Sequence, residues 1–445
     1  MSNEKKSTAK KRSTVRHTRA IQVAKTKQVP AAPPDAEVEK WLTEIVHPAT
    51  LRQLDHYHKM GLRERVLTLP VTVAFVLSLI WRQIGSVRDL VRVLGTEGLL
   101  WMTEPVPVSQ QAVCERLRSL PAELFERILA DVLVQMEARW QERKRPLAPE
   151  IAWVQERYTD VLVHDGSTLD ALLRKVGLLQ ESETNPLAGR MTALLSLVSR
   201  LPRRVWYEAD AQAHDQRFWP QILAALPAGA LLIFDLGYTN FQMFLELSAA
   251  QVTFLTRAKS NLRHQVEQVL FLSAQVHDQI VWIGKDDERQ RVRLVEILHQ
   301  GKWYRYLTSE LDAERLPTAY VFALYHQRWR IEDAYAIVKR LLGLAYLWTG
   351  AENGIQLQLW ATWLLYALLV DLTDAVAQAL NQPFAAISTE MVYRSLYYFT
   401  QAYHRGDASD LIAYLAQNQK LFGIRKYKFT RTYLIKLDLT SAQSP

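Results

Sequence analysis

The hydrophobic pattern changes its period near residue 158, and this change constrains the fold more than any other feature. From about residue 37 to 145, apolar residues recur at helical spacing with little strand signal. After residue 158 the apolar runs become short and are separated by turn-forming residues. Three hairpin-type strands followed by alternating helix and strand predict a mixed α/β sheet.

The predicted elements of this sheet follow one another closely. Strands are expected at 158–169, 191–200, 204–211, 230–238 and 252–257, with helices at 215–226 and 240–249. Further strand candidates lie at 279–284, 291–297 and 303–308. We interpret 258–312 as a β-rich insertion, because the chain then resumes a helical pattern. No internal repeat is present.

The helical segment after this insertion carries an unusual polar face. At about 100° per residue, Tyr325, Arg328 and Lys339 all lie within roughly 40° of Glu332 around the helix axis. The apolar residues of the segment fall on the far side; they are Ile331, Ala334, Val338, Leu341 and Ala345. Two cations, a phenol and one carboxylate favour a surface that meets phosphate and metal, although a lone Glu can also be a simple i,i+4 partner of Arg328.

The net charge is concentrated at one end of the chain. Residues 1–29 hold nine Lys/Arg and one Glu, which gives +8, and the whole chain is also +8. This aromatic-free arm ends at the Pro-rich stretch 30–34. We expect it to be disordered alone and attracted to polyanions. A solubilising tail without a specific partner is the alternative.

Composition argues against secretion and membrane insertion. The single Cys114 cannot form an internal disulfide, so a reducing cytosol is the expected compartment. No secretion-signal pattern is present at the N-terminus. The longest apolar runs, 71–81 and 359–370, are shorter than the roughly 20 residues needed to cross a bilayer. Both are predicted to be buried helices.

Two acids have the same local setting. Asp165 and Asp235 each follow an apolar strand and have a glycine within two residues. Acids at the carboxyl ends of neighbouring strands, with Glu332 reaching in from its helix, could hold Mg²⁺ or Mn²⁺. A pair of such ions can activate a water or 3′-hydroxyl and stabilise the leaving oxygen of a phosphodiester. Spacing alone does not exclude the competing acids Asp170, Asp210 and Asp215, and His164 is expected to be a neighbour rather than a ligand.

These residues form a recognisable pattern. The spacing Y-x2-R-x3-E-x6-K of Tyr325, Arg328, Glu332 and Lys339, with H164-D-G-S-T168 and F234-D-L-G-Y238, closely resembles the DDE transposases of the insertion-sequence-four family. The resemblance covers about 155–350. It implies an RNase-H-like mixed α/β sheet, interrupted by a β-rich insertion between the second Asp and the Glu, with helical regions on both sides.

The resemblance also implies residue roles. Asp165, Asp235 and Glu332 would be catalytic and bind two Mg²⁺ ions, for which Mn²⁺ can substitute. Tyr325, Arg328 and Lys339 would contact DNA phosphates. Family members often cut through a hairpin on the transposon end, helped by an aromatic side chain that stacks on a flipped base. Trp303 is the first candidate for that role and Trp282 the second, although either could simply pack the β-rich unit. Trp329 is expected to pack in the core.

The predicted organisation follows from these features. We expect a basic arm at 1–36, a helical DNA-end-binding domain at 37–150, the catalytic core at 151–350 and a C-terminal helical region at 351–445 that holds a homodimer together. The stretch 108–118 could be the second helix of a helix-turn-helix or part of an ordinary packed hairpin.

The predicted function is that of a cytoplasmic DNA transposase. It would cleave double-stranded DNA at the terminal inverted repeats of its element and transfer the 3′-hydroxyl into target DNA. The alternatives are a non-catalytic, transposase-derived DNA-binding protein and a related structure-specific nuclease without strand transfer.

Overall fold

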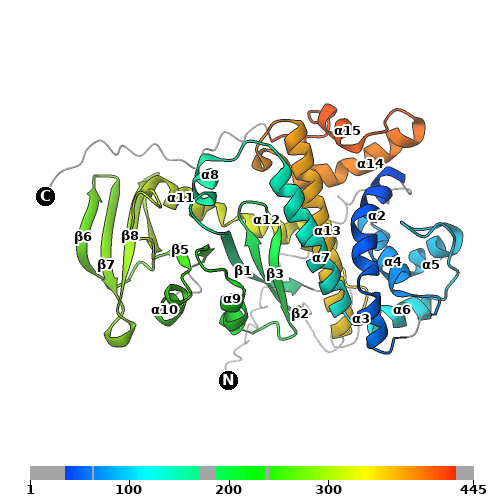
Figure 1. Cartoon of the computed structure of the whole chain (residues 1–445), viewed down its shortest axis with the longest axis horizontal. Helices are drawn as coiled ribbons and strands as arrows, with labels where there is room; N and C mark the ends of the chain where they lie inside the picture. Colours follow the sequence, from blue (N-terminus) through cyan, green and yellow to red (C-terminus); the bar gives the residue numbers. More distant parts are fainter. Residues whose placement is uncertain (1–35, 63–64, 171–186, 214, 236–239, 427–445) are drawn as a thin grey trace, which may run out of the picture.

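A nine-stranded mixed sheet extends from one end of the computed structural model to its middle, and helices fill the other end (Figure 1). The structure describes residues 36–62, 65–170, 187–213, 215–235 and 240–426. The strand order is β3-β2-β1-β4-β5-β9-β8-β7-β6. Helices lie beside this sheet and form most of the remainder of the molecule. The predicted basic arm falls almost wholly outside the described residues.

The first five strands have the arrangement expected for an RNase-H-like core. They are β1 (Val161–Asp170), β2 (Leu187–Ser196), β3 (Pro202–Glu208), β4 (Leu231–Phe234) and β5 (Thr253–Arg257). Strands β1, β2 and β3 pair antiparallel, whereas β4 pairs parallel with both β1 and β5. The predicted mixed α/β fold is therefore confirmed.

The predicted β-rich region extends this same sheet. Its strands are β6 (Gln265–Leu272), β7 (Val276–Ile283), β8 (Gln290–His299) and β9 (Lys302–Thr308), and all pair antiparallel. Strand β9 joins them to the core by pairing with β5. Inside this region the buried Arg293 guanidinium donates to Asp278 Oδ1 at 2.7 Å and to Thr318 Oγ1 at 3.1 Å, which fixes β8 to the helix that follows.

The two faces of the core sheet are covered differently. Helices α9 (Trp219–Ala225) and α10 (Phe241–Ala249) cover one face, where Phe234, Phe244 and Phe254 pack together. The opposite face packs against α11 (Thr318–Gln327), α12 (Arg330–Ala336) and α13 (Glu352–Ala379). Because side chains alternate along a strand, Val161, Val163, Leu231 and Ile233 all point to this second face.

The segment predicted as one helix around Glu332 is broken. Helix α11 ends at Gln327, α12 begins at Arg330, and a π-helical turn, η5 (Ile337–Leu341), follows. The buried stripe is nevertheless as expected, since Ile331, Ala334 and Val338 are fully or almost fully buried. Because π turns insert an extra residue, the helix register changes before Lys339, and a prediction from one continuous helix cannot place that side chain.

The N-terminal part of the chain is helical as predicted. Its helices are α2 (Ala36–Leu51), α3 (Leu54–Lys59), α4 (Leu69–Trp81), α5 (Val87–Thr96), α6 (Gln110–Ser119), α7 (Glu123–Glu142) and α8 (Pro149–Gln155). Ser109 caps α6 by accepting from the backbone N–H of Ala112 at 3.1 Å. The connection from Thr96 to Gln110 is longer than the turn of about three to four residues in a helix-turn-helix. This length favours the packed-hairpin interpretation of α6.

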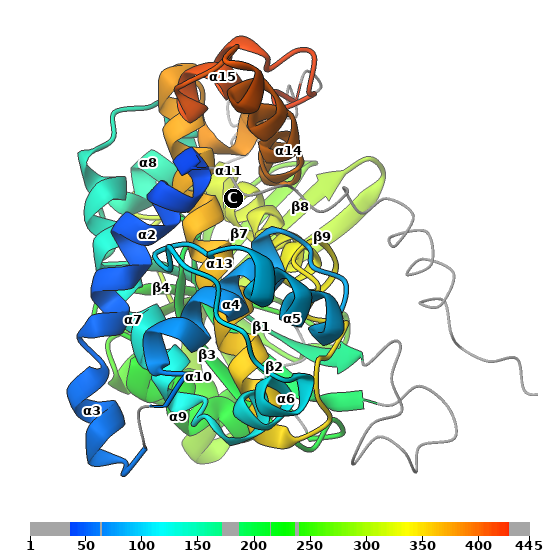
Figure 2. The same ribbon diagram turned by 90° about the vertical axis from the view of Figure 1, so that its right-hand side faces the viewer.

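Helix α13 runs through the middle of the helical part and contacts α4, α6 and α7 (Figures 1 and 2). It also contacts α14 (Thr389–Arg405) and α15 (Leu411–Gln417), which lie near its upper end in Figure 1. By length and composition alone it could cross a membrane, yet its most apolar window lies entirely inside the protein. The position of α13 in the protein core explains its apolar composition. Arg143 and Arg145 of the segment after α7 pair with the buried Asp374 of α13.

Candidate active site

Asp165 and Asp235 lie on neighbouring parallel strands at the same level. The last paired positions of β1 and β4 are His164 and Phe234, which are Cα partners. The two acids are therefore the next residues on strands that run side by side, about 4.8 Å apart. Unlike the prediction, Asp165 does not end its strand, because β1 continues to Asp170 as a hairpin with β2.

Both acids point to the face covered by α11 and α12. Asp165 follows Val163 and Asp235 follows Ile233 in the alternation of inward and outward side chains. Glu332 lies in the first turn of α12. The structure therefore brings together the three predicted acids, which are far apart in the sequence.

One guanidinium joins the three carboxylates. Arg328 Nη1 lies 2.9 Å from Asp165 Oδ2, and Arg328 Nη2 lies 3.4 Å from Glu332 Oε1 and 3.9 Å from Asp235 Oδ2. The Arg328 side chain is only 6% exposed. We call Asp165, Asp235, Glu332 and Arg328 the acidic cluster. Its formal charge is −2.

Hydrogen bonds hold the cluster in position. Tyr325 donates its hydroxyl to Asp235 Oδ1 at 2.8 Å. Two further hydroxyl groups, which the sequence did not single out, hold the Asp165 backbone. Tyr335 Oη donates to the Asp165 carbonyl at 2.6 Å, and Thr192 Oγ1 donates to the same carbonyl at 2.8 Å. Tyr335 lies three residues after Glu332, so helical spacing could have indicated it. Thr192 could be found only from the β1–β2 register.

Lys339 reaches β1 further along the strand. Its Nζ donates to Ser167 Oγ at 3.0 Å and to the Thr168 carbonyl at 2.7 Å. The π-helical turn η5 carries this lysine, which places it beside the β1 residues that follow Asp165 rather than against the carboxylates. Lys339 thus adds a positive charge at the border of the acidic cluster.

Burial and mutual repulsion shift the ionisation of these groups. Burial raises the pKa of Glu332, and the carboxylates of Asp165 and Asp235 raise it further, while Arg328 opposes them. Burial also raises the pKa of Tyr325, and the neighbouring Asp235 adds to this effect, so the phenol stays protonated and donates. Burial disfavours the charge of Arg328, but its anionic neighbours raise its pKa overall.

The donor set fits a hard divalent cation. Carboxylate oxygens are the ligands that Mg²⁺ and Mn²⁺ prefer, and the excess negative charge of the acidic cluster would attract such an ion. Among the described residues, however, no three His, Cys, Asp or Glu side chains already form a metal-ligand group. The Arg328 guanidinium, which contacts all three carboxylates, supplies the positive charge between them.

The other predicted candidates lie apart from the cluster or outside the described side chains. Asp210 is exposed and lies 3.9 Å from Arg217. The side chains of Asp170 and Asp215 lie outside the described residues. His164 is a neighbour, as expected: it is buried, its Nδ1 lies 3.2 Å from the Ala193 carbonyl, and burial lowers its pKa to about 4.

Of the three tryptophans singled out in the sequence, Trp329 does not have its expected position. Trp329, predicted to pack in the core, is 58% exposed, because the break between α11 and α12 turns it outward beside Arg328. Trp303 is 43% exposed and stacks on His277 at 4.5 Å. Trp282 is partly buried under the Arg289 guanidinium.

Arg257, at the carboxyl end of β5, was not anticipated. It is exposed, and its charge acts on the nearby phenol of Tyr325. Its backbone pairs with Tyr306 of β9, so the strand that carries Trp303 continues past the same edge of the sheet. Strand β5 is the parallel neighbour of β4, the strand before Asp235. The sequence position of Arg257 at the end of β5 could therefore have indicated this cation.

Comparison with known proteins finds a similar domain that includes part of this site. Residues 187–368 match the family model described as "Transposase DDE domain". This range includes Asp235, Arg328 and Glu332 but begins after Asp165. This stretch, which is less than half of the chain, is therefore similar to a transposase DDE domain, and it contains two of the three acids.

Individual proteins are more distant. The chain is 28% identical over 198 residues to "Putative transposase y4zB" of Sinorhizobium fredii (strain NBRC 101917 / NGR234), which covers 42% of this chain and 54% of that protein. The chain thus spans about half the length of this curated relative. A solved structure of the piggyBac transposase in a synaptic complex with hairpin DNA matches with a TM-score of 0.36 at 12% identity, over 89% of this chain and 85% of that one.

Proposed function

We propose that this protein is a divalent-metal-dependent DNA transposase of the insertion-sequence-four type. It would cut double-stranded DNA at the ends of its element and join the 3′-hydroxyl to target DNA. The convergence of Asp165, Asp235 and Glu332 on the Arg328 guanidinium carries the proposal. The similarity of residues 187–368 to a transposase DDE domain supports this chemistry.

The three carboxylates would hold two Mg²⁺ or Mn²⁺ ions. When bound, the ions would activate the attacking oxygen and stabilise the leaving oxygen of a phosphodiester. Before that, Arg328 keeps the three acids close together by offsetting their repulsion. Tyr325 keeps Asp235 oriented through its hydrogen bond. On loading, the Arg328 fork would be released to a DNA phosphate, a ligand that guanidinium groups bind with two parallel hydrogen bonds.

The DNA would lie along the carboxyl edge of the sheet. Tyr325, Arg328 and Lys339 line this edge as predicted phosphate contacts, and Arg257 adds a further exposed cation. Trp303 stays our candidate for stacking on a flipped base. Its replacement by Ala should reduce hairpin product more than first-strand nicking, and equal effects on both would contradict that role.

Cleavage of element-end DNA in Mg²⁺ tests the proposal directly. Glu332→Gln should reduce cutting by more than about 100-fold, since even partners outside the metal shell cost 10- to 100-fold, while DNA binding is retained. Glu314→Gln is the matched control, because Glu314 is exposed and has no ion pair among the described residues. Cutting by Glu332→Gln at the parent rate would show that the site is wrong.

The same assay separates the alternatives. A non-catalytic DNA-binding relative would bind the ends without cutting in either variant. A structure-specific nuclease would cut but give no joined product when pre-cut ends and a target plasmid are supplied. Joined product from the parent protein, absent with Glu332→Gln, is the result that only a transposase gives.

The arm and the assembly are further parts of the proposal. Residues 1–29 would bind DNA phosphates, so their deletion should weaken binding and flatten its salt dependence; an unchanged slope would remove the arm from the interface. The C-terminal helices would hold a dimer. The exposed side chains of Tyr398 and Leu421 offer an apolar surface there, and sedimentation showing only monomers with paired DNA ends would contradict this.

A further inference from the structure

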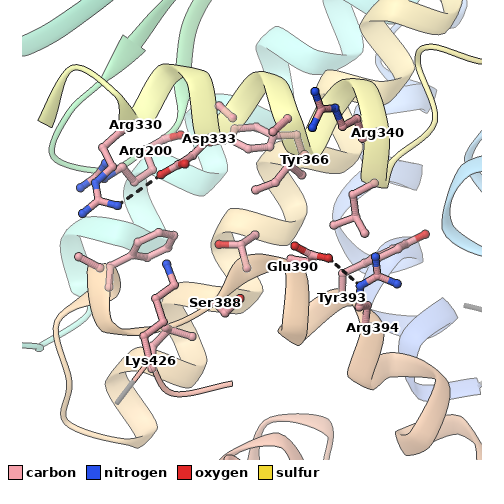
Figure 3. A pocket seen from close by; sticks show the side chains of 18 of the residues that line it. Arg200, Arg330, Asp333, Arg340, Tyr366, Ser388, Glu390, Tyr393, Arg394 and Lys426 are labelled. Carbon is pink, nitrogen blue, oxygen red and sulfur yellow. Dashed lines mark hydrogen bonds and ion pairs between the residues drawn. The ribbon is translucent and has the colours of Figure 1, made fainter. Parts of the chain in front are cut away.

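A second, oppositely charged site lies on the other side of the α12–η5 helix. A cavity of about 570 Å³ opens between α12, η5, α13, α14 and the β2–β3 turn (Figure 3). Glu332 faces the acidic cluster, whereas the next residue, Asp333, lines this cavity. The same short helix therefore separates two sites.

The lining of the cavity is strongly basic. Five basic and two acidic side chains line it, which gives a formal charge of +3; they are Arg200, Arg330, Arg340, Arg394, Lys426, Asp333 and Glu390. The two acids are already paired, Asp333 with Arg330 at 3.3 Å and Glu390 with Arg394 at 2.8 Å. Three cations are left without an ion pair among the described residues.

Arg200 is the most constrained of these cations. It is only 8% exposed, and its Nη2 donates to the neutral Gln327 Oε1 at 3.2 Å. Its φ of +65° is in the left-handed region, which is strained for a residue with a side chain. Tyr366 donates to its carbonyl at 3.1 Å and holds this turn in place. Burial, together with the charge of Arg330, lowers the pKa of Arg200 to about 9.

Lys426 and Arg340 complete the unpaired set. Lys426 extends into the cavity from the chain after α15, opposite Arg200 and Arg330 (Figure 3). Loss of hydration, with repulsion from Arg330, lowers the pKa of its ammonium group. Arg340 comes from the π-helical turn, directly after Lys339. Arg200 and Lys426 are both repelled by Arg330, so a bound anion would stabilise these two cations.

We propose that this cavity is a binding site for phosphate groups, distinct from the acidic cluster. Guanidinium and ammonium groups are the standard protein ligands of phosphate, and three unpaired cations match a polyphosphate better than a single carboxylate. The volume suits a ligand of nucleotide size. Tyr366, Phe384 and Tyr393 line the same cavity and offer apolar wall to a base or sugar. The phosphates could belong to a free nucleotide or to a nucleic-acid strand.

Calorimetric titration of the full-length protein tests this site independently of cleavage. The probes are ATP, inorganic triphosphate and a ten-nucleotide single-stranded DNA, in EDTA so that the metal-free acidic cluster repels phosphate. The pocket variant is Arg340→Gln with Lys426→Gln, because neither side chain has an ion pair among the described residues. The matched control is Arg88→Gln with Lys285→Gln, which removes the same charges from exposed positions elsewhere.

The pocket variant should bind at least one class of probe about tenfold more weakly than the control variant, since one charge-assisted hydrogen bond contributes about 1.5–3 kcal/mol. Loss for ATP and triphosphate identifies a free nucleotide as the ligand, and loss only for DNA identifies a strand. Equal binding of every probe by the two variants, with equal melting temperatures, would overturn the proposal. The basic N-terminal arm is present in both proteins and therefore cancels.

Discussion

The two faces of the α12–η5 helix have opposite electrostatic designs. On one face, three carboxylates share a single guanidinium, that of Arg328. On the other, five basic and two acidic side chains line one cavity, and both acids are already paired. Glu332 and Asp333, adjacent in the chain, belong to opposite faces. Excess charge of one sign marks a place for a ligand of the other sign, so the first face suits metal ions and the second suits phosphates.

The comparison also shows how differently the faces are held together without ligands. Arg328 is nearly buried and touches every member of the acidic cluster, so that cluster has an internal counterion. Among the residues that the structure describes, the basic cavity has no equivalent group, because Asp333 and Glu390 each pair with a neighbouring Arg on their own helix. Removing one cation should therefore have opposite consequences on the two faces.

The largest effect is expected for Arg328→Gln in EDTA. Loss of the counterion leaves three carboxylates facing one another, so the free energy of unfolding should fall by about 2 kcal/mol. This is less than the usual loss for a fully buried ion pair, because the carboxylates are partly exposed to solvent. Millimolar Mg²⁺ should restore most of it. Arg340→Gln, on the basic face, should leave stability unchanged or raise it by no more than about 0.5 kcal/mol. Addition of Mg²⁺ should not change the stability of this variant. Thermal unfolding with and without Mg²⁺ measures both, and a Mg²⁺-independent Arg328→Gln would contradict the comparison.

A smaller effect is expected for Tyr325→Phe. The variant loses the hydrogen bond to Asp235, which should cost about 1 kcal/mol of stability in EDTA. Tyr393→Phe is the matched change on the basic face, where the hydroxyl lies 3.0 Å from the Ile80 carbonyl. Both should melt earlier in EDTA. Only Tyr325→Phe should recover when Mg²⁺ is added, and recovery of both, or of neither, would show that Asp235 is not a metal ligand.

The smallest effect is a pH-dependent gain for Glu332→Gln. Because the pKa of Glu332 in the folded protein is raised above its ordinary value of 4.5, its charged form costs stability. The variant should therefore be more stable than the parent at neutral pH, by less than about 1 kcal/mol since the side chain is 40% exposed. The gain should vanish as the pH falls below 4.5. Melting curves from pH 4 to 8 in EDTA check this, and a variant that is less stable at pH 7 would contradict it.

Much of the site could be predicted because its signals are local. Apolar runs that end at Asp165 and Asp235 indicate strand acids, and the spacing of Tyr325, Arg328 and Glu332 is readable within eight residues. The sheet order was accessible only through family resemblance, since pairing between distant strands leaves little local trace. The predicted domain boundaries and the roles in DNA binding stay predictions.

The rest depends on tertiary structure. No Pro or Gly marks the break at Arg328 and Trp329, so the outward position of Trp329 could not be read from the pattern. The π-helical turn at Ile337–Leu341 likewise has no sequence signal of its own. The basic cavity combines side chains from the β2–β3 turn, α12, η5, α14 and the chain after α15, and their meeting is visible only in the folded chain.

The buried course of α13 has a practical consequence for dissecting the molecule. The family match ends at residue 368, inside a helix that continues to Ala379 and whose neighbours come from both ends of the chain. A fragment cut at that boundary would lose the last turns of this helix and expose apolar surface that α7, α14 and α15 normally cover. Expression trials should therefore keep residues 36–426 intact, and limited proteolysis should not release a stable catalytic fragment.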